Sequence, residues 1–171
     1  QPSTGIAGGL ISVSMPKVID LGGWAFSGCS QLKYISVPNV TSVGAYAFAN
    51  CIKLSTMDLH NVKELGNGVF YNRAYDNVYL RSVILSDELE NIPNKCFYGC
   101  KNLSDLTLPK SLKSIGYEAI PYFASEVVIP EGVTSIGSDN FTNSSSITIP
   151  STAQTIGSLG GKNLQHVYCN V

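Results

Sequence analysis

The chain repeats one short phrase along its length. The segments VPNVTSVGAYAF (37–48) and IPEGVTSIGSDNF (129–141) share a proline, then valine–threonine–serine, then glycine. Five further segments align on the same positions: MPKVIDLGGWAF, LHNVKELGNGVF, LSDELENIPNKCF, LPKSLKSIGYEAI and IPSTAQTIGSLGG. The units begin at Val13, Ile35, Met57, Val83, Leu106, Val127 and Ile147, and an eighth begins at Val167, at intervals of 22, 22, 26, 23, 21, 20 and 20 residues. Such a period is typical of solenoids, so the sequence predicts one continuous array without an internal linker.

One repeat, residues 35–54, has the pattern of a strand followed by a sharp bend. Ile35 and Val37 alternate with Ser36, which is the period of a half-exposed strand. Pro38 ends the strand because proline cannot donate a hydrogen bond to a ladder. Gly44 is expected to turn the chain with a positive φ, which glycine adopts without cost. The other repeats fill this slot with glycine or, once, proline: Gly22, Gly66, Pro93, Gly116, Gly137 and Gly157.

A coil of this length cannot bury its own apolar face. Coils stacked about 4.8 Å apart let each strand hydrogen-bond to the next one and share a core. The sequence therefore predicts an α/β-repeat solenoid, a right-handed coil with one parallel β-sheet on its concave face and irregular or short helical returns. In this arrangement Val37, Leu59 and Leu85 should lie in one interior column.

The segment ISVPNVTSVGAYAFANCIKL, residues 35–54, resembles the BspA-like class of leucine-rich repeats. The resemblance covers residues 13–171 and implies seven repeats plus a terminal strand. Residues 1–12 are expected to form an N-terminal cap or a leader-proximal segment. It weakens toward the C-terminus, where Gly161 replaces the aromatic residue of the motif. Members of this family are typically secreted or surface-displayed, chiefly bacterial proteins that act in adhesion and binding, and no shared catalytic residue comes with the resemblance.

The composition argues against several classes of partner. Charged residues make up only 13% of the chain, its net charge is −1, and no basic stripe offers the contacts that nucleic acid needs. No apolar run approaches the roughly 18 residues of a membrane span, so we expect no membrane insertion. The chain opens on QPSTGIAGGL without a signal sequence. We expect a mature form or an excised fragment of an exported protein, located outside the cell or on its surface.

The five cysteines fall at repeat positions that predict burial. Cys29, Cys51 and Cys100 share one slot, Cys96 replaces a small residue, and Cys169 matches the inward Val37. Reduced core thiols are the favoured interpretation, because unpaired cysteine is among the residues most often buried. A disulfide between Cys29 and Cys51 stays open as an alternative. A zinc site is disfavoured, because Cys96 and Cys100 have no second ligand pair.

Catalytic residues are scarce. His60 and His166 are predicted at unrelated surface positions, so no Ser–His–Asp or Cys–His arrangement can be proposed. Asp87, Glu88 and Glu90 gather at one bend, where a solvated turn is favoured over a pair of catalytic carboxylates. The sequence predicts a protein that is not an enzyme and has no cofactor. Asparagine–x–serine/threonine sequons occur at Asn39, Asn102, Asn140 and Asn143.

The outward strand positions form the first candidate binding surface. One predicted row is Tyr34, Thr56, Ser82, Asp105, Glu126, Ser146 and His166, and the other is Ser14, Ser36, Asp58, Ile84, Thr107, Val128, Thr148 and Tyr168. Repeat arrays use such extended surfaces for recognition, although isolated exposed apolar residues are also common without a role. The candidate ligand-binding residues are Tyr34, Asp58, Ile84, Asp105, Thr107, Glu126, Val128, Thr148, His166 and Tyr168.

The insert in repeat three is the second candidate. Tyr71, Tyr75 and Tyr79 recur every four residues, which would align them on a short helix. Tyrosine is favoured at interfaces. The alternative, which we favour, is that one or two of these rings repack the core where Arg73 takes the cysteine slot.

These features predict a non-catalytic module that mediates protein–protein or adhesive interactions with a protein or glycan ligand. A structural spacer within a larger surface protein is the alternative. The last strand leaves an open edge, which would allow edge-to-edge self-association.

Overall fold

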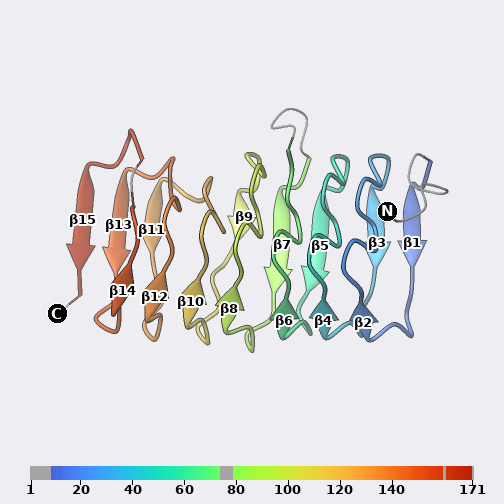
Figure 1. The fold of residues 1–171 in the computed structure, drawn as a ribbon, viewed down its shortest axis with the longest axis horizontal. Coiled ribbons are helices and arrows are strands. Elements are labelled where there is room, and N and C mark those ends of the chain that lie inside the picture. Colours follow the sequence, from blue (N-terminus) through green and yellow to red (C-terminus); the bar gives the residue numbers. More distant parts are fainter. Residues whose placement is uncertain (1–8, 74–78, 160, 171) are drawn as a thin grey trace.

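Each repeat forms one coil of a parallel β-solenoid in the computed structural model, which describes residues 9–73, 79–159 and 161–170. Most of the predicted N-terminal cap lies outside these residues. Every complete coil carries two strands, which run in opposite directions on two sides of the solenoid (Figure 1). The first side holds β1 Ser12–Ser14, β3 Tyr34–Ser36, β5 Thr56–Leu59, β7 Ser82–Leu85, β9 Asp105–Leu106, β11 Glu126–Val128, β13 Ser146–Ile149 and β15 His166–Cys169. The second holds β2 Asp20–Leu21, β4 Ser42–Val43, β6 Glu64–Leu65, β8 Asn91–Ile92, β10 Ser114–Ile115, β12 Ser135–Ile136 and β14 Thr155–Ile156.

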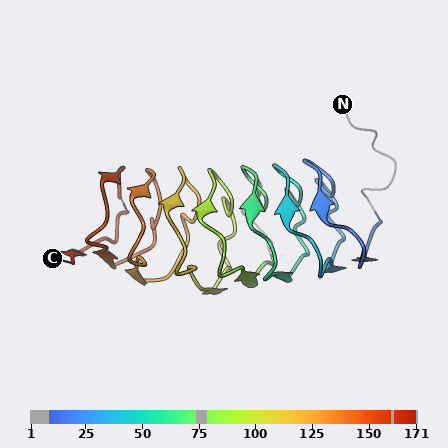
Figure 2. The same cartoon turned by 90° about the horizontal axis from the view of Figure 1, so that it is seen from below.

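We call the side of β1 to β15 the sheet face, and the side of β2 to β14 the back. The sheet face consists of three parallel ladders, β1–β3, β5–β7–β9 and β11–β13–β15. The back consists of two ladders, β2–β4–β6 and β8–β10–β12–β14. The sheet face is interrupted between β3 and β5 and between β9 and β11, and the back is interrupted between β6 and β8. At each interruption, the strands of the same two coils are paired on the other side. Seen from below, the coils follow one another as separate turns of similar width (Figure 2).

The glycine slot serves close packing between coils, which corrects the prediction of a positive φ. None of its six glycines is among the residues with positive φ in the described chain. A Cβ on Gly66 would instead lie 2.3 Å from the backbone nitrogen of Ala45, and one on Gly44 would lie 2.3 Å from that of Gly23. The glycine N–H also donates to the preceding coil, as from Gly44 to the Leu21 carbonyl at 2.7 Å.

Pro93 marks the interruption in the back. The glycines at this slot in other coils donate to the preceding strand, and Gly116 does so to the Ile92 carbonyl at 2.8 Å. Proline has no N–H, so Pro93 cannot make the equivalent bond to β6. The two coils remain joined by other backbone bonds, including one from the Phe70 N–H to the Cys96 carbonyl at 2.8 Å.

Positive φ occurs two residues after the glycine slot, mostly at residues with a side chain. Trp24, Tyr46, Gly68, Lys95, Glu118 and Asp139 occupy this position with φ between 48° and 63°. The chain then returns through turns, and alternate N–H groups donate to the next coil, as from Phe26 to the Ala47 carbonyl at 2.8 Å. The described residues contain no helix, so the short helical returns are not observed and the irregular ones are. Hydrogen bonds between coils satisfy the backbone groups that a helix would satisfy internally.

The core is built of aligned columns, as predicted. Leu59 lies directly opposite Leu85, and both Val37 and Leu59 are buried, while Leu85 is partly buried against the core. A second column stacks the rings of Phe26, Phe48, Phe70 and Phe97 at centroid distances of 5.5, 5.7 and 5.3 Å. Each ring fills the space beneath the next coil, so burial depends on the neighbouring coils.

The C-terminal end of the solenoid is open. Val167 continues the column of Val127 and Ile147, which are buried, but is itself exposed. Cys169 is exposed as well, which corrects the prediction that all five cysteines lie in the core. Its position faces inward, as the paired Ile149 does, but in the described chain no coil covers β15. The Asn170 amide donates to Glu131 Oε1 at 2.9 Å and holds the end of β15 against the array.

Candidate binding surface

Within each ladder of the sheet face, both predicted rows are present and in register. In the first row Thr56, Ser82 and Asp105 lie opposite one another, as do Glu126, Ser146 and His166. In the second row Asp58 lies opposite Ile84, and Val128, Thr148 and Tyr168 lie opposite one another. Tyr34 pairs with Ser12 in the first ladder, and Thr107 directly follows β9. The predicted binding residues therefore share one surface.

Apolar side chains interrupt the second row at three coils. Ile84 is 54% exposed, Val128 is 70% exposed and Tyr168 is 56% exposed. Tyr168 also stacks on His166 with ring centroids 6.1 Å apart. Burial of Ile84 and Val128 against a partner would stabilise a complex by about 25 cal/mol for each Å² of apolar surface removed from water.

A hollow of about 120 Å³ lies beside Ile84. Its floor and walls come from two successive coils: Val83, Ile84, Leu85, Asp87, Asp105, Thr107 and Pro109. Pockets for drug-sized ligands measure about 300–1,000 Å³, so this hollow fits a single side chain of a larger partner. Sequence reasoning found three of its residues, Ile84, Asp105 and Thr107, but not Asp87, which follows the strand.

The rows carry charge of one sign. Asp58, Asp105 and Glu126 stand in them, and neither row contains a lysine or arginine. The Ser82 hydroxyl donates to Asp105 Oδ2 at 2.7 Å, and among the described ion pairs none joins Asp105 or Glu126 to a basic residue. Lys33 and Arg81 stand one residue before β3 and β7, at the edge of the surface.

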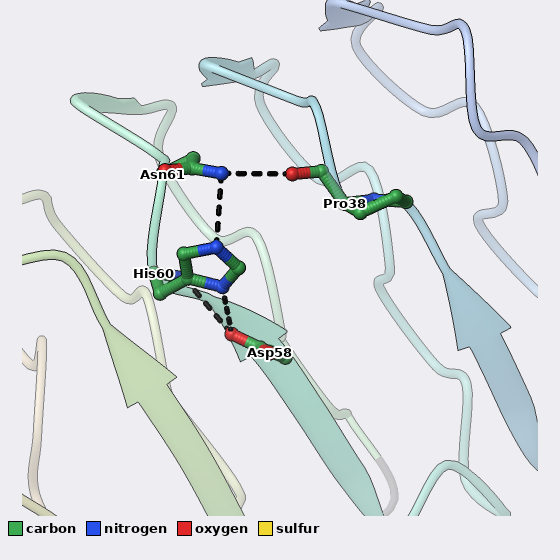
Figure 3. A network of polar contacts seen from close by, with 4 residues as sticks. All are labelled: Pro38, Asp58, His60 and Asn61. Atoms are coloured by element: carbon green, nitrogen blue, oxygen red, sulfur yellow. Dashed lines mark hydrogen bonds and ion pairs between the residues drawn. The ribbon is translucent and has the colours of Figure 1, made fainter.

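His60 extends this surface at coil three (Figure 3). Its Nδ1 lies 2.8 Å from Asp58 Oδ1, and its Nε2 lies 2.9 Å from the Asn61 side-chain nitrogen, which also donates to the Pro38 carbonyl at 2.8 Å. Since Nε2 accepts from Asn61, Nδ1 carries the proton and donates to Asp58. This network holds the Asp58 carboxylate in place, and no serine or cysteine nucleophile forms part of it.

The insert does not form the expected tyrosine helix in the part that the structure describes. Neither Tyr71 nor Tyr79 is helical, and Tyr75 lies outside the described residues. Arg73 points to solvent, and a space of about 10 Å³ remains between Cys51 and Cys100 where the cysteine slot is empty. Tyr71 is half-buried and packs on neighbouring rings, not in the core.

Those neighbouring rings form an aromatic ladder that sequence reasoning missed. Trp24 stacks on Tyr46 at 4.4 Å, Tyr46 meets Tyr71 edge-on at 5.9 Å, and Tyr71 stacks on Tyr98 at 5.2 Å. Lys95 Nζ lies 5.6 Å from the ring centroid of Tyr98 and 5.5 Å from that of Tyr117, and so extends the ladder to the next coil. The rings come from two slots of the repeat, two residues after the glycine slot for Trp24 and Tyr46 and five residues after it for Tyr71 and Tyr98, so no single periodic position reveals the whole ladder. Because their faces contact one another, they tie successive coils together.

The buried thiols have no chemical role that the structure supports. Burial raises the pKa of Cys51 and of Cys100 to about 12, so both remain protonated at neutral pH. The Cys51 thiol donates to the Phe26 carbonyl at 3.1 Å, and the cysteines are unpaired. Within the described ranges, no three histidine, cysteine or acidic residues gather as a metal site would require. No helix among the described residues is long and apolar enough to cross a membrane.

Stacked strands, a close-packed glycine slot and inward leucines and phenylalanines define a leucine-rich-repeat solenoid. The chain belongs to the BspA-type leucine-rich-repeat family, since the BspA type leucine rich repeat region matches residues 8–120 and 71–159 in six copies. A search of curated proteins gives no significant match.

Solved structures of bacterial leucine-rich-repeat proteins resemble the chain. One from Bacteroides ovatus is 20% identical and superposes with a TM-score of 0.54 over 94% of this chain and 61% of that one. The T. pallidum leucine-rich-repeat protein is 21% identical, with a TM-score of 0.48 over 93% of this chain and 69% of that one. The chain spans about three fifths of the B. ovatus protein, and the likeness concerns the fold.

Proposed function

We propose that this chain is a non-catalytic module, secreted or displayed on a cell surface, that binds another protein through its sheet face. The observation that carries this proposal is the row of exposed apolar side chains, Ile84, Val128 and Tyr168, on otherwise polar strands. Apolar residues at the centre of a polar surface are the usual anchors of protein interfaces. We infer the surface location from the family, because its members act mostly outside the cell.

The shape of the surface favours a protein over a small molecule. The rows run along all eight strands of the sheet face, and the hollow beside Ile84 takes only one side chain. A broad surface with one small depression suits an anchor residue surrounded by weaker contacts. A glycan is the alternative ligand, and the capture experiment described next distinguishes it from a protein.

The test is capture of immobilised extracellular-matrix proteins and glycans by the purified chain, compared with an Ile84→Ser/Val128→Ser variant. Wild-type chain should bind at least one matrix protein, and the variant should bind it about tenfold or more weakly, as expected for loss of two interface anchors. Ile11→Ser/Ile19→Ser is the matched control, because these isoleucines are similarly exposed but lie outside the rows. If both variants bind the matrix protein equally well, the sheet face is not the binding surface. Capture of glycans alone would favour a saccharide ligand, and capture of nothing would favour the spacer.

The open edge of β15 supports self-association as a second interaction of the same module. Its outer backbone groups have no strand beside them in the described chain, and Val167 and Cys169 are exposed there. Pairing with another copy would cover both features. Light scattering should show a mass that rises with concentration and that falls to the monomer in Val167→Pro. A monomer at all concentrations would refute this pairing.

A further inference from the structure

We propose that the protein partner presents a basic, extended segment to the sheet face and places one lysine or arginine in the hollow beside Ile84. This inference rests on the proposed function and names the chemistry of its partner. Exposure of the sheet face alone does not indicate what binds there. The charge of this face and the residues that line the hollow indicate the chemistry of the partner.

The hollow has the two parts that a long basic side chain needs. Ile84 supplies exposed apolar surface, and the acidic residues Asp87 and Asp105 line the hollow beside it, while the side chains of Val83 and Leu85 belong to the core. Lysine and arginine pack their methylene stems on apolar surface while the charged head stays near water or a counter-ion. An acidic side chain would be repelled here, and an aliphatic one would leave both carboxylates without an ion pair.

The neighbouring coil repeats the same combination. Glu126 and Val128 are two residues apart on β11, and both point outward. Asp105 stands on β9 of the preceding coil, but β9 and β11 belong to separate ladders and do not pair with each other. An extended segment that alternates basic and apolar residues would meet acidic and apolar side chains on both strands.

The placement of these charges does not favour stability. The cross-strand neighbours of Asp105 and Glu126 are Ser82 and Ser146, so neither carboxylate faces a basic residue within its ladder. No described lysine or arginine pairs with Asp87, Asp105 or Glu126. The two rows carry three carboxylates and no lysine or arginine, although the chain as a whole has a net charge of only −1. Departures from local stability rules are typical of functional surfaces.

Three synthetic peptides of equal length test the inference. They share the same leucines, which are separated by lysine, by glutamine or by glutamate. The chain should bind the lysine peptide about tenfold more tightly than the glutamine peptide, and should not bind the glutamate peptide. Raising the salt from about 0.1 M to about 1 M, which shortens the screening length from about 10 Å to about 3 Å, should remove most of this preference.

Variants locate the effect. Asp87→Asn/Asp105→Asn should weaken binding of the lysine peptide roughly tenfold. Asp20→Asn/Glu64→Gln removes the same charge from the back, where Asp20 accepts a hydrogen bond from Ser42 as Asp105 does from Ser82, and should leave affinity unchanged. Unaltered thermal midpoints would show that both variants are folded.

The outcomes separate the two proposals. No binding of the lysine peptide, equal binding of the lysine and glutamine peptides, or equal losses in the two charge variants would each overturn the basic partner. If a matrix protein still needs Ile84 and Val128 in that case, the sheet face remains the binding surface. If neither ligand depends on those two residues, the proposed function fails as well.

Discussion

Asn140 is a buried polar residue whose side chain stabilises the core. Its side chain is fully buried, donates to the carbonyls of Gly116 and Gly137 at 2.7 and 2.8 Å, and accepts from the Ile120 N–H at 2.9 Å. The amide therefore satisfies backbone groups of two coils, and burial excludes the sequon at this position as an accessible modification site.

Asn140→Ala should lower the free energy of unfolding by about 2–4 kcal/mol, because the substitution leaves several backbone groups unpaired in the interior. Urea denaturation measures the change. Asn143→Ala is the matched control, since Asn143 is exposed in the same coil, and should shift stability by less than about 0.5 kcal/mol. A loss of similar size in both variants would contradict the role of the Asn140 amide.

The cysteines differ in accessibility. Four thiols are buried and Cys169 is exposed. Titration of the native chain with a thiol reagent should therefore modify one cysteine, and none after Cys169→Ser. In denaturant all five should react, whereas three would reveal a disulfide such as one between Cys29 and Cys51.

At the scale of the coil, the glycine slot sets how closely neighbours approach. A methyl group on Gly66 would meet the Ala45 backbone, which cannot move without separating two coils. Gly66→Ala should cost about 3 kcal/mol of stability. Gly22→Ala places its methyl group in open space and should be neutral or slightly stabilising. Comparable losses would show that the slot needs glycine for its backbone conformation.

The contacts of Glu131 at the last coils depend on pH. A hydrogen bond from Asn170 and others from Ser151 hold the pKa of the Glu131 carboxyl below its usual value. A lowered folded-state pKa stabilises the fold above the unfolded value, about 4.3, and this contribution is lost as the pH falls through the folded value. Glu131→Gln should therefore lower the thermal midpoint at pH 7. It should not lower the midpoint at an acidic pH at which the Glu131 carboxyl is protonated in both the folded and the unfolded chain. A pH-independent difference for Glu131→Gln would contradict the linkage.

The sequence predicts strands more reliably than the segments between them. Strand residues alternate with a period of two, so the sequence alone places Asp58, Ile84 and Val128 on one face. The role predicted for Gly44 is wrong, because a recurring slot shows that glycine is needed but not whether φ or space requires it. The return segments bond to the next coil, and that pairing depends on stacking, which no single repeat encodes.

The candidate site is predictable to the same extent. Its strand residues follow from the repeat, but Asp87 reaches the hollow from a turn, where side-chain direction has no fixed period. The ladder of Trp24, Tyr46, Tyr71 and Tyr98 escapes prediction because it changes position in the repeat, from two residues after the glycine slot to five residues after it. The contact that joins the two positions, Tyr46 with Tyr71, is revealed only by the three-dimensional arrangement.

The whole molecule is an array whose two sides have different compositions. The sheet face carries the hollow, the exposed apolar residues and unpaired carboxylates, whereas the ladder of aromatic rings and the short back strands tie coils together. Because each coil buries its interior only against its neighbours, outward residues can change without loss of the fold. This division explains how a rigid array can present a binding surface along its length.

Steric blocking of one side of the solenoid is a direct test of binding through the sheet face. In a Cys169→Ser background, a bulky polymer is attached to the thiol of Thr107→Cys on the sheet face or of Glu64→Cys on the back, and capture of the bound matrix protein is measured. We expect the polymer to abolish capture when attached at position 107 and to leave it intact at position 64. Equal capture by the two conjugates, or loss only at position 64, would contradict binding through the sheet face.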